Sequence, residues 1–169
     1  MHLSFVAIVM LAATLPCVAT SAAELTADPA HQQVTLAGTQ PSAAGPSAFF
    51  SGRVRVDPLS PAGDAINVSS AYVTFEPGAP SAWHTHPRGQ YLVVTAGVGL
   101  TQEWGKPMQT IRPGDVVWCP PGAKHWHGAT SITAMTHLAI TGTADGKNVN
   151  WMEKVSDEQY GTHVFEEAH

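Results

Sequence analysis

The chain has 169 residues, a formal net charge of −5, 44% hydrophobic residues and 12% charged residues. This length and composition favour one compact domain with a core of useful size, and they argue against several domains or a disordered chain. The mildly acidic balance and the lack of a basic cluster argue against nucleic acid or an anionic membrane as the main partner. We therefore expect a small-molecule partner.

The first residues are typical of an export signal. Leu3–Leu15 is almost entirely apolar, and small residues follow it from Ala19 to Ala23. We predict that residues 1–23 form a cleavable signal peptide and that the mature protein is periplasmic or secreted. A retained anchor is the alternative, because only the amino terminus and His2 carry positive charge before the apolar run. That run is short for a membrane span, so we expect no stable membrane insertion after signal removal.

The remaining chain predicts an arm followed by a folded domain. Residues 24–47 are rich in Ala, Pro, Ser, Thr and Gly without an apolar period, which indicates a flexible N-terminal arm, and residues 48–169 form the domain. Signal removal takes away Cys17 and leaves Cys119 as the only thiol, so no internal disulfide is expected. We interpret Cys119 as a small buried hydrophobic residue rather than a nucleophile.

Short β-type runs, separated by turns that contain proline and glycine, occupy the chain from Phe49 onwards. Their spacing predicts an all-β antiparallel barrel or sandwich. Ser156, with Gln159 three residues later, is a helix-capping pair and predicts a short C-terminal helix. The β-type runs are residues 49–56, 66–75, 90–96, 100–104, 116–119 and 132–141.

Four potential metal ligands are arranged around one turn and one distant segment. His84 and His86 are two residues apart, so in an extended strand both imidazoles point to the same side. The Pro87-Arg88-Gly89 turn reverses the chain, so that the Gln90 oxygen can face the two imidazoles. His125 supplies a third imidazole from a distant strand. We predict that these residues bind one divalent ion; manganese, iron, nickel and zinc all suit mixed nitrogen and oxygen ligands.

Two segments resemble the two motifs of the cupin family. The first motif is matched, with Gln in place of the usual Glu, by Gly78-x5-His84-x-His86-x3-Gln90-x6-Gly97. The second motif is matched by Gly114-x5-Pro120-Pro121-Gly122-x2-His125, with Ala129 where the general pattern has a non-ligand Asn. The resemblance implies a single-domain cupin, which is a double-stranded β-helix or jelly-roll barrel.

Residues 49–160 are more closely similar to small bacterial cupins that include the manganese-dependent hydroxynitrile lyases. The similarity is carried by residues 73–79, 82–87, 114–118, 124–129, 134–140 and 151–153. It implies cleavage of cyanohydrins such as mandelonitrile to an aldehyde and cyanide, with manganese as the first choice of metal. It also implies a homodimer, a pocket role for His127 and His137 in catalysis, and metal binding by His84, His86, Gln90 and His125. Gln matches Thr141 in these lyases, so the chain departs from their pattern there.

The absence of a carboxylate from the predicted ligand set has a chemical consequence. Three neutral imidazoles and one amide leave the double charge of the ion uncompensated, so the ion acts as a stronger Lewis acid. It should lower the pKa of a bound water or alcohol and attract an anionic product. Four protein ligands also leave positions open on an ion that prefers six, which is typical of a catalytic site.

Alternative interpretations stay open at this stage. The chain can be a cupin that kept the fold but lost the metal, and Gln90 can hydrogen-bond a ligand water instead of binding the ion. His127 and His137 can be buried wall residues held by hydrogen bonds. The alternative functions are a metal-dependent dioxygenase and a non-catalytic module that binds a metal and a small ligand. Large aromatic residues most often fill a core, which is how we interpret Trp83, Trp118 and Trp126.

Overall fold

The computed structural model describes residues 31–63 and 66–161. The predicted signal peptide and the first residues of the predicted arm lie outside these ranges. The chain divides into two units, Met1–Val34 and Thr35–His169. In the first unit, residues 31–34 are exposed and have no regular secondary structure. No helix within the described ranges has the length and apolar character needed to cross a membrane.

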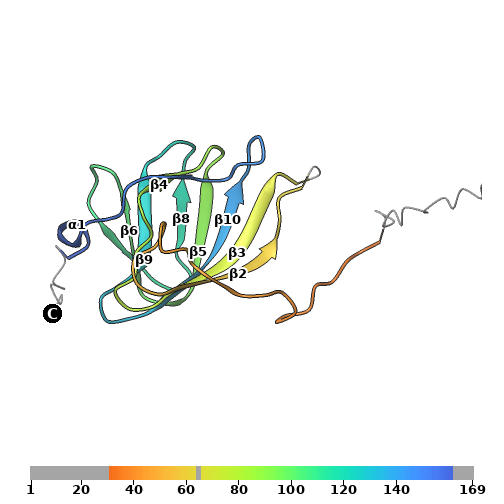
Figure 1. Cartoon of the computed structure of the whole chain (residues 1–169), viewed down its shortest axis with the longest axis horizontal. Coiled ribbons are helices and arrows are strands. Elements are labelled where there is room, and N and C mark those ends of the chain that lie inside the picture. Colours follow the sequence, from red (N-terminus) through yellow and green to blue (C-terminus); the bar gives the residue numbers. More distant parts are fainter. Residues whose placement is uncertain (1–30, 64–65, 162–169) are drawn as a thin grey trace, which may run out of the picture. The chain divides into compact units, whose positions relative to one another are not determined.

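The described residues of the second unit form two antiparallel sheets and one short helix, as predicted for an all-β barrel with a C-terminal helix (Figure 1). The order in the six-stranded sheet is β1-β2-β3-β10-β5-β8, and the order in the five-stranded sheet is β11-β4-β9-β6-β7. The strands are β1 (Ala43–Ala44), β2 (Val54–Ser60), β3 (Val68–Phe75), β4 (His84–Thr85), β5 (Gln90–Gly97), β6 (Gly99–Glu103), β7 (Gln109–Ile111), β8 (Val116–Cys119), β9 (His125–Ala129), β10 (Met135–Gly142) and β11 (Asn150–Trp151).

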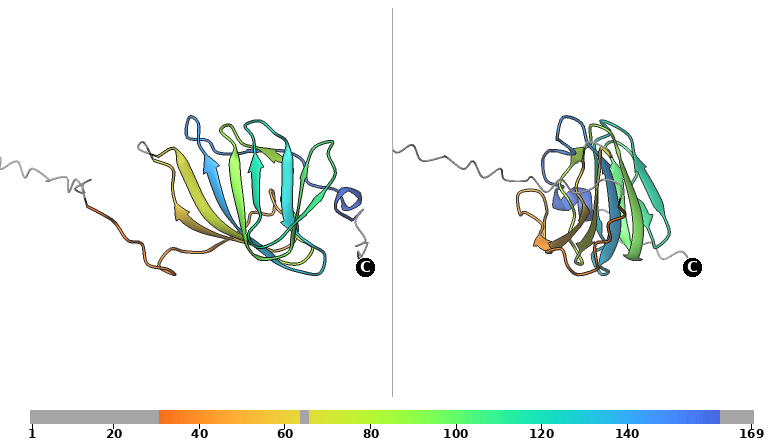
Figure 2. Two further views of the ribbon diagram at one scale, coloured as in Figure 1. Left: turned by 180° about the vertical axis from the view of Figure 1, so that it is seen from behind. Right: turned by 90° about the vertical axis from the view of Figure 1, so that its right-hand side faces the viewer.

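Strand β10 is the centre of the six-stranded sheet and pairs with β3 on one side and β5 on the other (Figure 2). Its buried side chains alternate with half-buried ones, which is the period of a strand with one face on the core. His137 and Thr141 belong to the buried set. Both side chains therefore point into the interior between the sheets.

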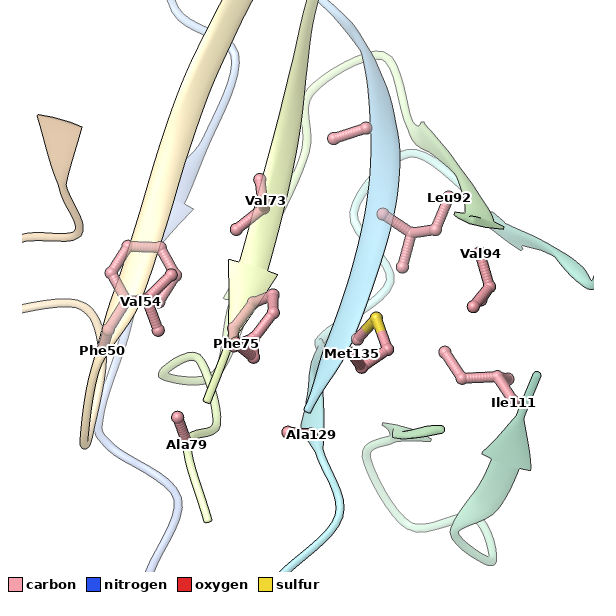
Figure 3. Packing of buried hydrophobic residues seen from close by; sticks show 11 residues of the cluster. Phe50, Val54, Val73, Phe75, Ala79, Leu92, Val94, Ile111, Ala129 and Met135 are labelled. Carbon is pink, nitrogen blue, oxygen red and sulfur yellow. The ribbon is translucent and has the colours of Figure 1, made fainter. Parts of the chain in front are cut away.

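Apolar side chains from both sheets meet in the core (Figure 3). Phe75, Leu92 and Met135 come from the six-stranded sheet, and Ile111 and Ala129 come from the five-stranded sheet; none is more than 5% exposed. Burying a side chain of the size of Leu or Phe stabilises a fold by about 1.5–3 kcal/mol. This core therefore holds the two sheets together.

The C-terminal helix α1 (Asp157–Gly161) begins as the sequence predicts. The backbone N–H of Gln159 donates to Ser156 Oγ over 3.2 Å, and the backbone N–H of Ser156 donates to Gln159 Oε1 over 2.9 Å. This reciprocal pair is a capping box. The Tyr160 ring packs on Trp126 and its hydroxyl donates to the Ala129 carbonyl, so α1 lies against β9.

Some expectations need correction. The first β-type run was predicted from Phe49, but β2 begins only at Val54, because the backbone turns at Gly52, where φ is +70°. The core prediction holds for Trp83 and Trp126, which are 2% and 0% exposed. It is wrong for Trp118, which is 46% exposed because its side chain points outward from β8.

Candidate metal centre

The predicted site residues come from both sheets and meet between them. His84 lies on β4, and His125 lies opposite it on β9 in the antiparallel pairing. His86 follows β4, and Gln90 is the first residue of β5. All four side chains are at most 6% exposed. The chain therefore brings together three imidazoles and one amide in its interior.

The turn between His86 and Gln90 depends on one glycine. Gly89 has φ of +78°, in the left-handed region that L side chains rarely adopt. A Cβ atom there would lie 2.4 Å from the Trp118 side chain and 2.8 Å from the Cys119 carbonyl oxygen. Both the backbone conformation and the available space therefore require glycine at this position. The turn at Gly89 lets the chain reverse between His86 and Gln90.

Four imidazole rings, those of His84, His86, His125 and His127, are closely grouped between the two sheets. The ring centroids of His84 and His125 lie 4.3 Å apart, and the His86 ring lies 5.0 Å from His84 and 5.3 Å from His125. The ring of His127, two residues after His125 on β9, lies 5.2 Å from that of His84. Potential ligand atoms of His84, His125 and His127 all lie within 4.8 Å of one another, so these three histidines can hold a metal ion.

Backbone carbonyl groups determine which ring nitrogen carries the proton in three of these histidines. Nδ1 of His84 lies 2.8 Å from the Ala82 oxygen, and Nδ1 of His125 lies 2.9 Å from the Ala123 oxygen. Nδ1 of His86 lies 2.6 Å from the oxygen of Asn148. A carbonyl only accepts hydrogen bonds, so each Nδ1 donates and each neutral ring keeps its lone pair on Nε2.

Several lone pairs of the cluster have no hydrogen-bond partner. Nε2 of His86, His125 and His127 and Oε1 of Gln90 are buried and unpartnered. A buried polar atom without a partner costs about 1–3 kcal/mol. One cation among these atoms would satisfy them together, and neutral nitrogen and amide oxygen donors suit divalent transition metals. The residues present therefore fit a metal ion.

Burial keeps these imidazoles neutral. It lowers the pKa of His125 to about 4, and it lowers the pKa of His84 well below its usual value, with a further contribution from nearby His125. Burial also lowers the pKa of His86. The nearby Asn148 carbonyl and Gln90 amide act in the opposite direction and raise the pKa of His86, but burial outweighs them. His86 Nε2 and Gln90 Oε1 have no hydrogen-bond partner. Neutral imidazoles are the form that binds a metal.

His127 of this cluster forms a buried pair with His137 of β10. His127 Nδ1 and His137 Nε2 are 3.1 Å apart, and both rings contact Phe75 of the core. Burial lowers the pKa of His137 to about 3, and burial with the neighbouring His137 lowers the pKa of His127 well below its usual value. The pair is therefore neutral near pH 7, and each ring keeps one nitrogen lone pair.

A cavity of about 310 Å³ opens beside the histidines. Its polar end includes His84, His86, Gln90, His127 and His137. Its apolar walls are Pro46, Phe49, Phe50, Val56, Val73, Ala139, Val149 and Trp151. The Phe49 and Trp151 rings are stacked, 4.8 Å apart with an interplanar angle of 9°. The arrangement suits a small molecule with one polar end and one aromatic or aliphatic end.

Comparison with known proteins places the chain in a family. The family model described as "Cupin domain" matches residues 71–141. The (R)-mandelonitrile lyase of Granulicella tundricola is 58% identical over 128 residues, which cover 76% of this chain and 98% of that protein. The chain belongs to the cupin family. The predicted all-β cupin fold is thereby confirmed.

Solved structures agree with this assignment. A cupin-like protein from Thermotoga maritima has a TM-score of 0.66 and 38% identity to this cupin, covering 76% of this chain and 95% of that one. A cupin-2 domain from Rhodospirillum rubrum has a TM-score of 0.58 at 21% identity, covering 72% of this chain and 80% of that one, and shows the fold alone.

Sequence reasoning missed the apolar walls of the cavity and one buried hydrogen bond. Phe49 and Trp151 stand more than a hundred residues apart in the sequence, and no motif spacing connects them. Gln90 Nε2 donates to Thr141 Oγ1 over 2.9 Å, a contact that depends on the pairing of β5 with β10. Cys119 is buried, and burial followed by the charge of Glu103 raises the pKa of its thiol to about 12, so the thiol is protonated near pH 7.

Proposed function

We propose that this cupin is a metal-dependent lyase that cleaves a cyanohydrin, such as mandelonitrile, to an aldehyde and hydrogen cyanide. The observation that carries the proposal is the set of unpartnered, buried lone pairs at the polar end of an aromatic-walled cavity. The relative from Granulicella tundricola, which is named for the lyase activity and matches over nearly its whole length, supports it.

The proposed ligands are His84, His86, Gln90 and His125, and manganese is the first choice of metal. The support is that the Nδ1 groups of His84, His86 and His125 donate to backbone carbonyl groups, and that Nε2 of His86, Nε2 of His125 and Oε1 of Gln90 have no hydrogen-bond partner. When bound, the ion would polarise the substrate hydroxyl and offset negative charge that develops as the carbon–carbon bond breaks. His127 is the competing ligand, since its ligand atom also lies close to those of His84 and His125.

In our proposal His127 is the base. Its unpartnered Nε2 takes the proton of the substrate hydroxyl, the O–H electron pair forms the carbonyl, and the C–CN pair leaves with cyanide. The protonated His127 then returns this proton to cyanide, giving hydrogen cyanide and the aldehyde. We assign the proton of the 3.1 Å contact between His127 Nδ1 and His137 Nε2 to His127, so that His137 accepts the hydrogen bond and holds the His127 ring in place. General acid-base help of this kind is worth about 10²–10⁴-fold in rate.

The apolar walls of the cavity would hold the substrate side chain. Phe49 and Trp151 stack on each other, and the Trp151 ring also lies 4.8 Å from that of His84. An aryl group placed against these rings would bring the adjacent carbinol carbon to the histidines. Aromatic contacts are worth about 0.5–1.5 kcal/mol beyond the burial of area.

We also propose that the protein is exported after cleavage following Ala23. The support is the apolar run and small residues at the start of the sequence. Amino-terminal sequencing of protein recovered from the periplasm or medium should begin at Glu24. A mature chain that still begins at Met1 would contradict this part of the proposal.

A homodimer is supported by the outer face of the six-stranded sheet. An antiparallel sheet that faces water normally carries polar residues on that side. Here Tyr91 pairs with Trp118, and Tyr72 pairs with Leu138. Tyr72, Tyr91, Val116 and Trp118 are 38–60% exposed. These exposed apolar side chains suit self-association with a second copy. Arg55 and Asp57, the charged residues beside them on β2, form an ion pair with each other.

The function is tested by incubating metal-stripped protein, reloaded with each candidate metal, with racemic mandelonitrile. Benzaldehyde and cyanide should appear in equal amounts with manganese, above a chelated control, and without oxygen uptake. Oxygen consumption with phenols or diketones would instead identify a dioxygenase. Tight ligand binding without turnover by any metal form would identify a binding module.

A further inference from the structure

We propose that Thr141 is a positioning residue whose hydroxyl fixes the orientation of the Gln90 amide. This inference rests on the proposed ligand set, in which Gln90 binds the metal through its oxygen. Thr141 itself would not touch the metal. It would determine which end of the Gln90 amide faces the imidazoles.

The geometry places the two side chains directly beside each other. Gln90 and Thr141 are paired residues in the β5–β10 register, and each is 6% exposed. Gln90 Nε2 donates to Thr141 Oγ1 over 2.9 Å, and Gln90 Oε1 has no hydrogen-bond partner. The amide nitrogen is therefore occupied, and the oxygen lone pairs are left for the interior.

An amide needs such a contact because its two ends have nearly the same shape but opposite chemistry. The oxygen can bind a cation, whereas the NH₂ group only donates hydrogen bonds and would face the ion with its hydrogens. Rotation by 180° would exchange the two ends at little steric cost. A fixed acceptor for the NH₂ group removes that freedom, as partners of metal ligands commonly do.

The same part of the structure also holds a second proposed ligand. Asn148 Nδ2 donates to Ser69 Oγ over 3.0 Å, and the Asn148 carbonyl lies 2.6 Å from His86 Nδ1. Ser69 is the residue paired with Thr141 in the β3–β10 register. Gln90 and His86 are thus both held by contacts that involve residues at the end of β10 or the strand paired with it.

The test compares manganese dissociation constants of the whole mature protein and its variants. Thr141→Val keeps the shape and removes the acceptor, so its affinity should fall by about 10–100-fold. Thr141→Ser keeps the hydroxyl and should bind manganese about as tightly as the natural protein does. Thr143→Val is the matched control, because Thr143 is equally buried and its hydroxyl has no partner. It should bind manganese as the natural protein does.

A second comparison separates positioning from a general structural role. Glu in place of Gln90 has two equivalent oxygens and needs no orientation, so Thr141→Val should cost far less affinity in a Gln90→Glu background. A structural defect would cost the same in both backgrounds and would overturn the inference, as would Thr141→Val binding manganese normally. Failure of the natural protein to bind any divalent metal would overturn the proposed ligand set itself. If the Val variant does not fold, Thr141→Ala gives the same comparison.

Discussion

Three backbone carbonyl groups, those of Ala82, Ala123 and Asn148, prepare three imidazoles for metal binding before any ion arrives. Each takes the Nδ1 hydrogen and leaves Nε2 as the free donor. Burial then keeps the rings neutral, since it lowers the pKa of every histidine in the cluster. The site owes its donor strength to local backbone geometry and burial, without a carboxylate among the proposed ligands.

The roles of His86 and His127 can be separated by measuring metal content and activity together. We expect His86→Ala to lose most of its manganese and its activity. His127→Ala should keep manganese and lose about 10²–10⁴-fold in turnover, because it removes the proposed base alone. Metal analysis of the dialysed variants and benzaldehyde release provide the two measurements. The reverse pattern, with metal lost on changing His127 and retained on changing His86, would make His127 the ligand.

Acid should destabilise the metal-free protein. The pKa of His125 is about 4 and that of His137 about 3 in the fold, against about 6.5 in an unfolded chain. Between these values the unfolded chain binds protons that the fold excludes, so the free energy of unfolding falls as the pH falls, by up to about 1.4 kcal/mol per pH unit for each histidine. Urea unfolding of chelated protein should show full stability above about pH 7 and progressive loss from about pH 6.5 towards pH 4. Equal urea midpoints at pH 7.5 and pH 5 would contradict this.

The sequence was sufficient to predict which donors meet, because motif spacing implies a strand, a turn and a strand around His84, His86 and Gln90. It could not predict the Thr141 contact, since that hydrogen bond joins residues 51 positions apart through the register of two strands. The outward direction of Trp118 was missed for a similar reason. It depends on where β8 pairs with β5 at the edge of the sheet.

At the level of elements, the longer strands and the capped helix were predictable from period and turn chemistry. The strands β1, β7 and β11 were not, because runs of two or three residues carry no period. The two-residue strand β4 was expected only from the spacing of His84 and His86. These short strands matter for the site. β11 pairs with β4 and places Trp151 opposite His84, so one wall of the cavity and one proposed ligand share a two-residue pairing.

The turn that joins β4 to β5 should be intolerant of any side chain at Gly89. Gly89→Ala would combine left-handed strain with contacts of 2.4 Å and 2.8 Å to Trp118 and Cys119. Gly105→Ala is the control, since Gly105 has φ of +74° but nothing within 4 Å of an added Cβ. We expect the control to lose about 1–2 kcal/mol in urea unfolding and Gly89→Ala to lose a further 1–3 kcal/mol or so and bind manganese more weakly. Equal losses with normal metal binding would show that the turn can adjust.

For the whole molecule, the exposed apolar face of the six-stranded sheet should decide the oligomeric state. Tyr72→Glu with Val116→Glu would place charges on both copies of this face, and we expect light scattering after size exclusion to change from a dimer mass to a monomer mass. Ile132→Glu is the control, because Ile132 is 75% exposed in a loop before β10. A natural protein that is already monomeric, or a double variant that stays dimeric, would exclude this face as the interface.

The most direct test of the central claim is a titration of manganese into metal-stripped protein while mandelonitrile cleavage is followed. If the histidine and glutamine cluster is the catalytic metal site, benzaldehyde release should rise in proportion to bound metal and stop rising at one ion per chain. His84→Ala should neither bind the ion nor gain activity at the same manganese concentrations. Cleavage that is unchanged by metal removal, or absent from fully loaded protein, would contradict the account.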